Sequence, residues 1–167
     1  MKHIRYPVLL AALLLLVLLA ACGPAQEPAP VETQTHEQTT TETSDAQMEP
    51  TLQLTINRTP VPVTWETNAS VQALRELAAA NPLTVRLSMY GGFEQVGSLG
   101  TALPRSDKRT TTSAGDIVLY SGDQIVLFYG SNTWSYTRLG KITGQTQADL
   151  AALLGSGDVT ITLSCGA

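Results

Sequence analysis

Histidine is nearly absent from this sequence of 167 residues. The two histidines, His3 and His36, both precede the segment that we expect to fold. A domain without histidine cannot assemble the usual Ser-His-Asp or Cys-His nucleophile, a histidine-based zinc site or a histidine base near neutral pH. The commonest hydrolase and metalloenzyme schemes are therefore excluded in their usual form.

Cysteine is equally scarce, because Cys22 and Cys165 are the two in the chain. With one cysteine in the expected domain, neither a dithiol redox pair nor a thiolate metal cage can form there. The sequence also lacks Walker and dinucleotide-binding fingerprints and any run with the ligand spacing of a calcium loop. We predict no metal and no cofactor.

What the sequence does contain begins with a short apolar run. Residues 8–21, VLLAALLLLVLLAA, follow a basic start, and their 14 residues fall short of the roughly 18–20 of a membrane-spanning helix. This pattern is typical of a secretory signal. It ends in Leu-Ala-Ala-Cys (19–22), which resembles the lipobox of bacterial lipoproteins, a family in which the cysteine is lipidated after cleavage.

We therefore expect a signal peptide at residues 1–21 and a lipid on Cys22 as the membrane partner. The protein would then be anchored to the bacterial cell membrane, with its domain outside the cytoplasm. A plain signal peptide with an incidental cysteine, or an uncleaved anchor helix, remains the alternative.

The composition changes abruptly at residues 22–50, which follow this signal. They are rich in Pro, Thr, Gln and Glu, contain six acidic residues and no Lys or Arg, and have almost no large apolar side chain. Such a segment cannot bury enough surface to offset chain entropy, so we predict a disordered tether that spans on the order of 30 Å. From Thr51 onward eight acidic and eight basic residues balance, which gives no electrostatic reason to expect a nucleic-acid partner.

Residues 51–167 have the length of one domain with a single core. Apolar and polar residues alternate in several short runs, which predicts strands with one wet face. These runs lie at residues 52–57, 61–65, 85–90 and 159–163, and two fully apolar strands are predicted within 116–130. The glycines of residues 91–100 predict an irregular segment, and Pro60 and Pro62 predict an edge strand or a bulge.

Two helices are expected beside these strands. Asn68 or Ser70 can cap the first, which Asn81-Pro82 ends, and Thr146 begins the second with a capping box to Asp149. Many strands with two short helices favour a mainly β fold in which the sheet closes into a barrel, since closure removes exposed edges.

Three segments carry a resemblance to a known family. They are GGFEQVGSLG (91–100), LPRSDKRTTTSAGDIVLYSGDQIVLFYGSNTWSYTRLGKI (103–142) and LGSGDVTITL (154–163). They resemble a bacterial family described as cyclophilin-like, and the resemblance covers nearly all of residues 52–164. It implies a closed cyclophilin-like β-barrel with two short flanking helices, and it implies no assigned activity.

Candidate site residues come from the stretch GSNTWSYTRL (130–139). In a strand, Trp134, Tyr136 and Arg138 would share one face. There the rings would supply contact area and the guanidinium would bind a carboxylate, carbonyl or amide. The other residues expected to line such a site are Tyr90, Phe93, Glu94 and Tyr129. The alternative is that the rings pack on the barrel wall and Arg138 pairs with Glu94 or Asp116.

Three functions remain open. The first is a non-enzymatic, membrane-tethered module that binds a peptide or small ligand. The second is a weak peptidyl-prolyl isomerase or folding helper, in which Arg138 would donate toward the prolyl nitrogen. The catalytic sequence motifs of true cyclophilins are not found, so no catalytic residue is carried over from them. The third is a structural protein of the cell envelope without a ligand. The oligomeric state is not predicted.

Overall fold

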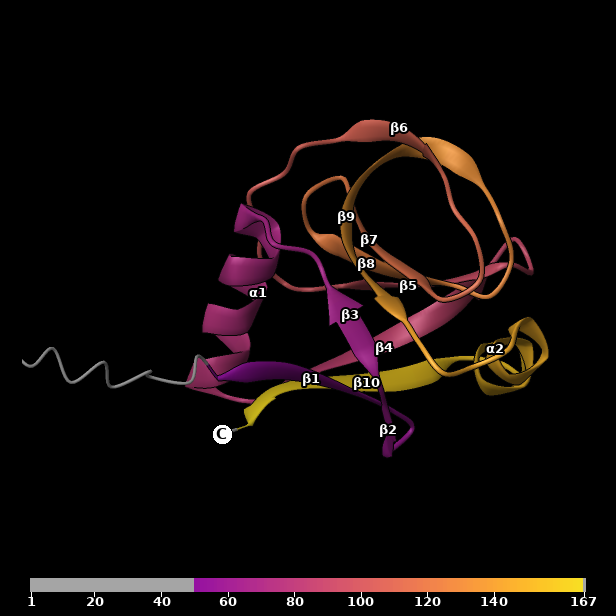
Figure 1. Ribbon diagram of the computed structural model, residues 1–167, viewed down its shortest axis with the longest axis horizontal. Coiled ribbons are helices and arrows are strands. Elements are labelled where there is room, and N and C mark those ends of the chain that lie inside the picture. Colours follow the sequence, from indigo (N-terminus) through magenta and orange to yellow (C-terminus); the bar gives the residue numbers. More distant parts are fainter. Residues whose placement is uncertain (1–49, 167) are drawn as a thin grey trace, which may run out of the picture. The chain divides into compact units, whose positions relative to one another are not determined.

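The computed structural model describes residues 50–166, which form a mainly β domain with two helices (Figure 1). The signal peptide, the lipidated Cys22 and most of the tether that the sequence predicts lie outside the described residues. None of the helices in residues 50–166 is both long and apolar enough to cross a membrane.

The chain forms ten strands and two helices within the described residues. They are β1 (Thr51–Ile56), β2 (Thr59–Val61), β3 (Val63–Trp65), α1 (Ala69–Ala80), β4 (Leu83–Tyr90), β5 (Glu94–Ser98), β6 (Lys108–Thr111), β7 (Asp116–Tyr120), β8 (Gln124–Phe128), β9 (Thr133–Ile142), α2 (Gln147–Leu154) and β10 (Val159–Gly166).

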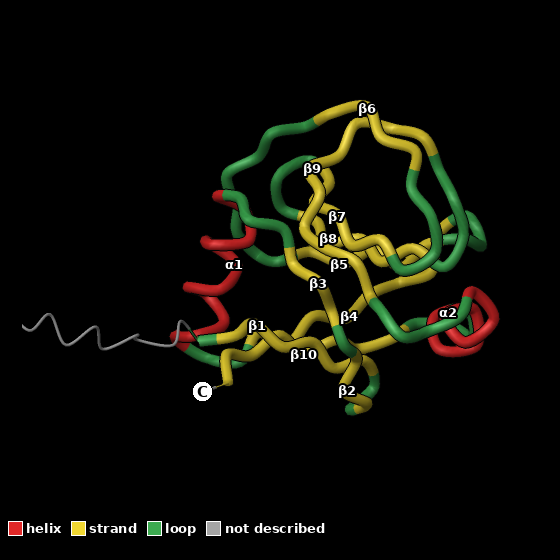
Figure 2. Tube along the Cα trace, in the orientation of Figure 1, coloured by secondary structure: helices red, strands yellow, loops and turns green. Residues whose placement is uncertain are grey.

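The strands join into one antiparallel sheet that curls into a nearly closed barrel (Figure 2). Their order is β2-β1-β10-β4-β5-β8-β7-β9-β3, and β6 pairs with the first part of β9. The barrel and its two helices confirm the predicted fold class, with one correction: closure is incomplete at a single seam, where β2 and β3 end the path.

The seam lies at Pro60 and Pro62. β2 and β3 are separated by Pro62 alone, so the chain leaves one end of the sheet and immediately joins the other. Proline has no N–H to donate to a ladder, which explains why both strands are short edge strands. The Trp65 indole Nε1–H crosses the seam instead and donates to the Leu52 carbonyl at 2.7 Å.

Apolar side chains from all around the sheet fill the barrel interior. Leu54 of β1, Leu87 of β4, Ile125 of β8 and Ile161 of β10 are all fully or almost fully buried in this core. Both helices add apolar residues to the same cluster. The interior is therefore packed with the protein's own side chains.

The helix boundaries confirm the capping signals in the sequence. The Asn68 side chain accepts from the Val71 N–H at the start of α1. Thr146 and Asp149 form the predicted capping box at the start of α2, and Gly155 closes that helix.

Two elements were not predicted: β6, whose residues Lys108–Thr111 are all polar and show no apolar alternation, and β5. The segment at residues 91–100 contains the five-residue strand β5, although its glycines suggested irregular structure. Only the two ends of the segment, at Gly91 and Gly92 and at Gly100, are irregular in the expected way, and all three glycines have positive φ. β5 escaped prediction because its buried positions include Glu94 and Gln95, so no apolar alternation marks it.

Candidate functional site

Strands β7 and β8 form a stretch of barrel wall that is apolar on both faces, and β5 pairs with β8 beside them. Ile125 and Leu127 of β8 point into the barrel core, while Val126 and Phe128 belong to a second apolar cluster on the opposite face. Successive side chains of a strand alternate between faces, so the outer face of this wall is a second, smaller packing surface. The candidate site lies on that outer face.

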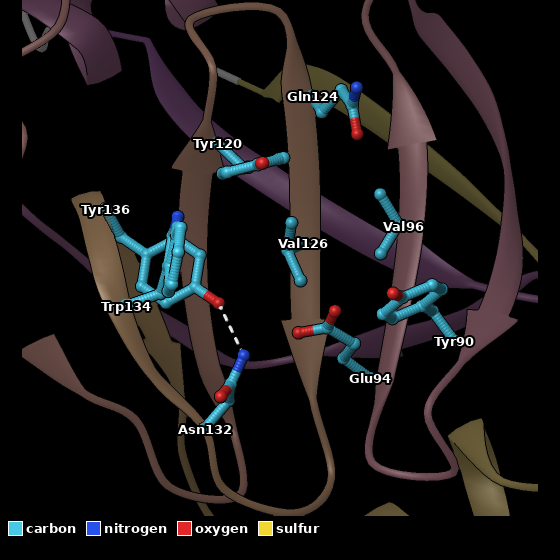
Figure 3. A pocket seen from close by; sticks show the side chains of 9 residues that line it. All are labelled: Tyr90, Glu94, Val96, Tyr120, Gln124, Val126, Asn132, Trp134 and Tyr136. Carbon is cyan, nitrogen blue, oxygen red and sulfur yellow. Dashed lines mark hydrogen bonds between the residues drawn. The ribbon is translucent and has the colours of Figure 1, made fainter.

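A cavity of about 380 Å³ opens on this face (Figure 3). Its lining comes from five neighbouring strands, β4, β5, β8, β7 and β9, and from the residue before β9, Asn132. The lining residues are Tyr90, Glu94, Val96, Tyr120, Gln124, Val126, Asn132, Trp134 and Tyr136. This volume is within the range of small-molecule pockets, at its lower end.

Glu94 is held in the wall by main-chain geometry. It is the first residue of β5 and lies opposite Phe128 of β8 in the antiparallel register. The preceding Phe93 carbonyl accepts the N–H groups of Tyr129 at 3.0 Å and Gly130 at 2.9 Å. A Cβ at Gly130 would lie 2.6 Å from the Phe93 Cβ, so this close approach of the two segments requires a glycine.

The Glu94 carboxyl group is buried and unpaired. The residue is 6% exposed, its Oε2 has no hydrogen-bond partner, and none of the five ion pairs among the described residues includes it. Burial raises the pKa of Glu94 from 4.5 to about 7. Glu94 is therefore an acceptor that can take up or release a proton near neutral pH.

The tyrosines near Glu94 respond to the same environment. Burial, and second the charge of Glu94, raise the pKa of Tyr129 above its ordinary value of 10.0. The same two causes raise the pKa of Tyr136, although a hydrogen bond from Asn132 partly opposes them. Both phenols therefore stay protonated at neutral pH, when Glu94 titrates.

Aromatic contacts fix the orientation of Tyr136 on the wall. Its ring packs edge-on against Phe128, with centroids 5.7 Å apart, and against Tyr120 at 6.1 Å. Asn132 Nδ2 donates to the Tyr136 Oη at 3.0 Å, so the phenolic proton stays available to another acceptor. The hydroxyl of Tyr136 thus points toward the same opening as the Glu94 carboxyl group (Figure 3).

Two exposed aromatic residues form the rim. Trp134 on β9 is 55% exposed and Tyr90 at the end of β4 is 66% exposed. In Figure 3 they lie on opposite sides of the cavity, with Glu94 between them. An aromatic ring left half in water provides contact area that a ligand can cover.

Arg138 lies outside this cavity. Its guanidinium pairs with Asp116 at 3.2 Å and with Glu66 at 3.3 Å, and it lines a separate hollow of about 290 Å³. Arg138 therefore does not line the cavity with Trp134. Of the alternative, the structure has the ion pair with Asp116, whereas Trp134 is left half exposed. Strand alternation placed the guanidinium on the correct face, but the side chain reaches along β9 to the buried carboxylate of β7.

Asp116 is the shared acceptor of the ion pairs around Arg138. It also accepts from Lys141 Nζ at 2.9 Å and from the Ser113 N–H at 2.8 Å. Burial acts to raise the pKa of Asp116, but Lys141, Ser113 and Arg138 together outweigh burial and lower the pKa below its ordinary 3.8. Both cations are thus committed to an ionised carboxylate that is 2% exposed.

The two remaining predicted site residues do not line the cavity: Phe93 packs on the outer face of the wall and Tyr129 lies in the core behind it. Phe93 stacks on Phe128, with centroids 6.5 Å apart, and Tyr129 packs in the barrel core with its hydroxyl unpartnered. Four of the seven predicted residues therefore meet in one cavity: Tyr90, Glu94, Trp134 and Tyr136. Whether they bind a ligand stays a prediction.

Five lining residues were missed from the sequence. They are Val96, Tyr120, Gln124, Val126 and Asn132. Tyr120 and Gln124 flank the predicted turn between β7 and β8, and strand alternation through Val126 would have placed them on one face. Val96 could not be found in this way, because β5 itself was not recognised.

Residues 50–166 offer no group of three or more His, Cys, Asp or Glu side chains placed to hold a metal ion. The chemistry of the cavity is thus that of one carboxyl group, polar amides and hydroxyls, and four aromatic rings.

Comparison with known proteins identifies the architecture. A family model described as cyclophilin-like matches residues 54–164. The solution structure of a hypothetical protein from Archaeoglobus fulgidus is similar in fold, with 15% sequence identity and a TM-score of 0.51 over 69% of this chain and 93% of that one. No curated protein matches the sequence.

Proposed function

The chain belongs to the cyclophilin-like family, and we propose that its domain is a non-enzymatic module that binds a small ligand or peptide segment in the Glu94 cavity. The observation that carries the proposal is a buried acceptor without a partner, Glu94, in a cavity rimmed by exposed rings. A buried polar group without a hydrogen bond costs stability. A ligand that supplied the missing donor would remove that cost.

The arrangement favours binding over prolyl isomerisation. An isomerase of the cyclophilin type would need a cationic donor beside the apolar pocket, and the nine residues that line this cavity include neither Arg nor Lys. Arg138, the residue suggested for that role, is bound to Asp116 and Glu66. We expect no acceleration of proline-peptide isomerisation, and acceleration that Arg138→Ala abolishes would reverse this choice.

A ligand screen tests the binding function. Trp134 lies on the rim and Trp65 at the seam, so a cavity ligand should change the fluorescence of the native protein but not that of Trp134→Phe. Val96→Phe, which puts a ring into the cavity, should abolish ligand-induced thermal stabilisation. The binding function is contradicted if peptides and small molecules from envelope extracts leave both signals unchanged.

The second part of the proposal concerns location. We propose that the domain is held at the outer face of a bacterial cell membrane by a lipid on Cys22, at the end of the tether of residues 22–50. One acyl chain gives only marginal attachment, so the multiple acylation of the lipoprotein family suits a stable anchor. The Leu-Ala-Ala-Cys sequence supports this placement.

Membrane fractionation with labelled fatty acid tests the anchor. Cys22→Ser should lose the label and leave the membrane fraction, while Cys165→Ser, the matched control within the domain, should keep both. Retention of the label by Cys22→Ser would contradict lipidation at that residue.

A further inference from the structure

One buried carboxyl group and four aromatic rings line the Glu94 cavity. In Figure 3 the Glu94 carboxyl group lies near the centre, Tyr90 to its right, Trp134 and Tyr136 to its left, and Tyr120 above them. All five residues line the same cavity, and Val126 lies between them. We infer that this cavity selects a small organic ammonium compound, whose positive charge pairs with Glu94 while its carbon substituents contact the rings.

The unpaired carboxyl group is the first argument for a cation. Glu94 is more than nine-tenths buried, Oε2 has no partner, and the cavity contains no Lys, Arg or His that could neutralise it. The nearby cations Arg138 and Lys141 are already paired with Asp116. A buried carboxylate is stabilised by a proton or by an opposite charge, and within this cavity only a ligand can bring the opposite charge.

The four rings are the second, independent argument. Aromatic faces attract cations through their quadrupole, and cages of such rings are the usual receptors for alkylated ammonium groups. Trp134, the strongest ring type for this interaction, is half exposed at the rim. A neutral or anionic ligand would use the apolar area of the rings but would leave the carboxylate unneutralised.

The size of the cavity favours a small ligand over a macromolecule. At about 380 Å³ it is near the lower limit for small-molecule sites. Ammonium groups of this kind occur on free compounds and on lipid headgroups, and the residues of the cavity recognise the group that both sources share. Experiments must therefore separate the two sources.

The inference rests on the proposed binding function, but ammonium selection can be refuted while the binding function still holds. Calorimetric titration of the full-length protein in an uncharged maltoside detergent should compare choline with 3,3-dimethyl-1-butanol, which replaces the charged nitrogen by carbon. We expect choline to bind at least tenfold more tightly than this neutral analogue. A soluble phosphocholine ester forms a further arm, and preference for it over choline identifies a lipid headgroup as the source.

Two variants test the assigned contacts. Glu94→Gln keeps the shape of the side chain but removes the charge, so it should weaken choline binding at least tenfold and leave the neutral analogue unaffected. Trp134→Leu should weaken choline more than the analogue. Glu66→Gln, which removes a carboxylate outside this cavity, is the matched control and should leave binding unchanged.

The pH dependence supplies a readout that a merely structural role would not move. Choline does not titrate, and the titratable side chains around Glu94 are tyrosines. Tyr90 of β4, Tyr120 of β7 and Tyr136 of β9 line the cavity, and Tyr129 after β8 lies behind it in the core. With a pKa of about 7, Glu94 is about one-tenth ionised at pH 6 and about nine-tenths at pH 8. Affinity for choline should therefore rise about tenfold over that range.

The outcomes separate the inference from the function on which it rests. Equal affinity for choline and its neutral analogue, or unchanged choline binding in Glu94→Gln, overturns ammonium selection and leaves a binding cavity in place. Absence of binding by choline and the phosphocholine ester also overturns the inference. The binding function itself is contradicted only if the extract screen with the Val96→Phe control also shows no change in fluorescence or thermal stability.

Discussion

Replacing Glu94 with glutamine should stabilise the unliganded protein at alkaline pH. The carboxyl group is 6% exposed and unpartnered, and burial raises its pKa from 4.5 to about 7. Between these two values the folded state binds more protons than the unfolded state, so the free energy of unfolding falls as the pH rises. The loss begins near pH 4.5 and is complete above pH 7.

The size of the effect follows from the shift. One pKa unit corresponds to about 1.4 kcal/mol, so ionised Glu94 destabilises the fold by about 3 kcal/mol at pH 8.5. Glutamine resembles the protonated acid in shape and cannot ionise. Glu94→Gln should therefore match the native protein near pH 5 and exceed its stability by about 3 kcal/mol at pH 8.5.

Urea unfolding followed by circular dichroism, in steps from pH 5 to pH 8.5, measures this difference. Glu76→Gln is the matched control, because Glu76 is an exposed carboxylate on α1 and its replacement should give no pH-dependent difference. A parallel ¹³C titration of the Glu94 carboxyl carbon gives the pKa directly. A midpoint near 4.5, with no stabilisation of Glu94→Gln at pH 8.5, would refute the reasoning.

Three further substitutions test other parts of the structure. Asp116→Asn should lower the unfolding free energy by about 2 kcal/mol at pH 7, because two charge-assisted hydrogen bonds are lost. Since the pKa of Asp116 is lowered in the folded state, the difference between the native protein and Asp116→Asn should vanish as the pH falls below 3.8. Trp65→Phe should cost about 1 kcal/mol and speed amide exchange in β1, since the hydrogen bond across the seam is removed; unchanged exchange there would contradict the assigned role. Gly130→Ala should cost about 1 to 3 kcal/mol in urea unfolding, because its Cβ would collide with Phe93, and an unchanged midpoint would show that the turn can shift freely.

Local sequence signals were enough to predict most of the barrel. Alternating apolar residues identified β1, β4 and β10, and the capping residues Asn68 and Thr146 identified both helices. Pro60 and Pro62 predicted an edge strand or a bulge at the seam, although the sequence could not show that the two ends of the sheet meet there. That meeting depends on how nine strands curve together, which is a property of the whole sheet.

The site was harder to predict than the fold, for a physical reason. Strand alternation correctly grouped Trp134 and Tyr136, but a long, flexible side chain such as Arg138 goes to the strongest available partner. That partner was the buried Asp116, next to β9 on β7. The sequence showed both charges but not their distance, so pairing and ligand binding could not be separated.

The position of Glu94 also explains why the site lies outside the barrel and not within it. The interior is filled by apolar side chains, whereas the outer face of β5, β8 and β7 is covered only in part, by the segment that carries Trp134 and Tyr136. A glutamine at position 94 would fit the same space without the cost of ionisation. Residues that lower stability in this way are typical of functional positions, where another interaction offsets their cost. In the unliganded domain no such interaction reaches the carboxyl group, so the compensation must come from what binds there.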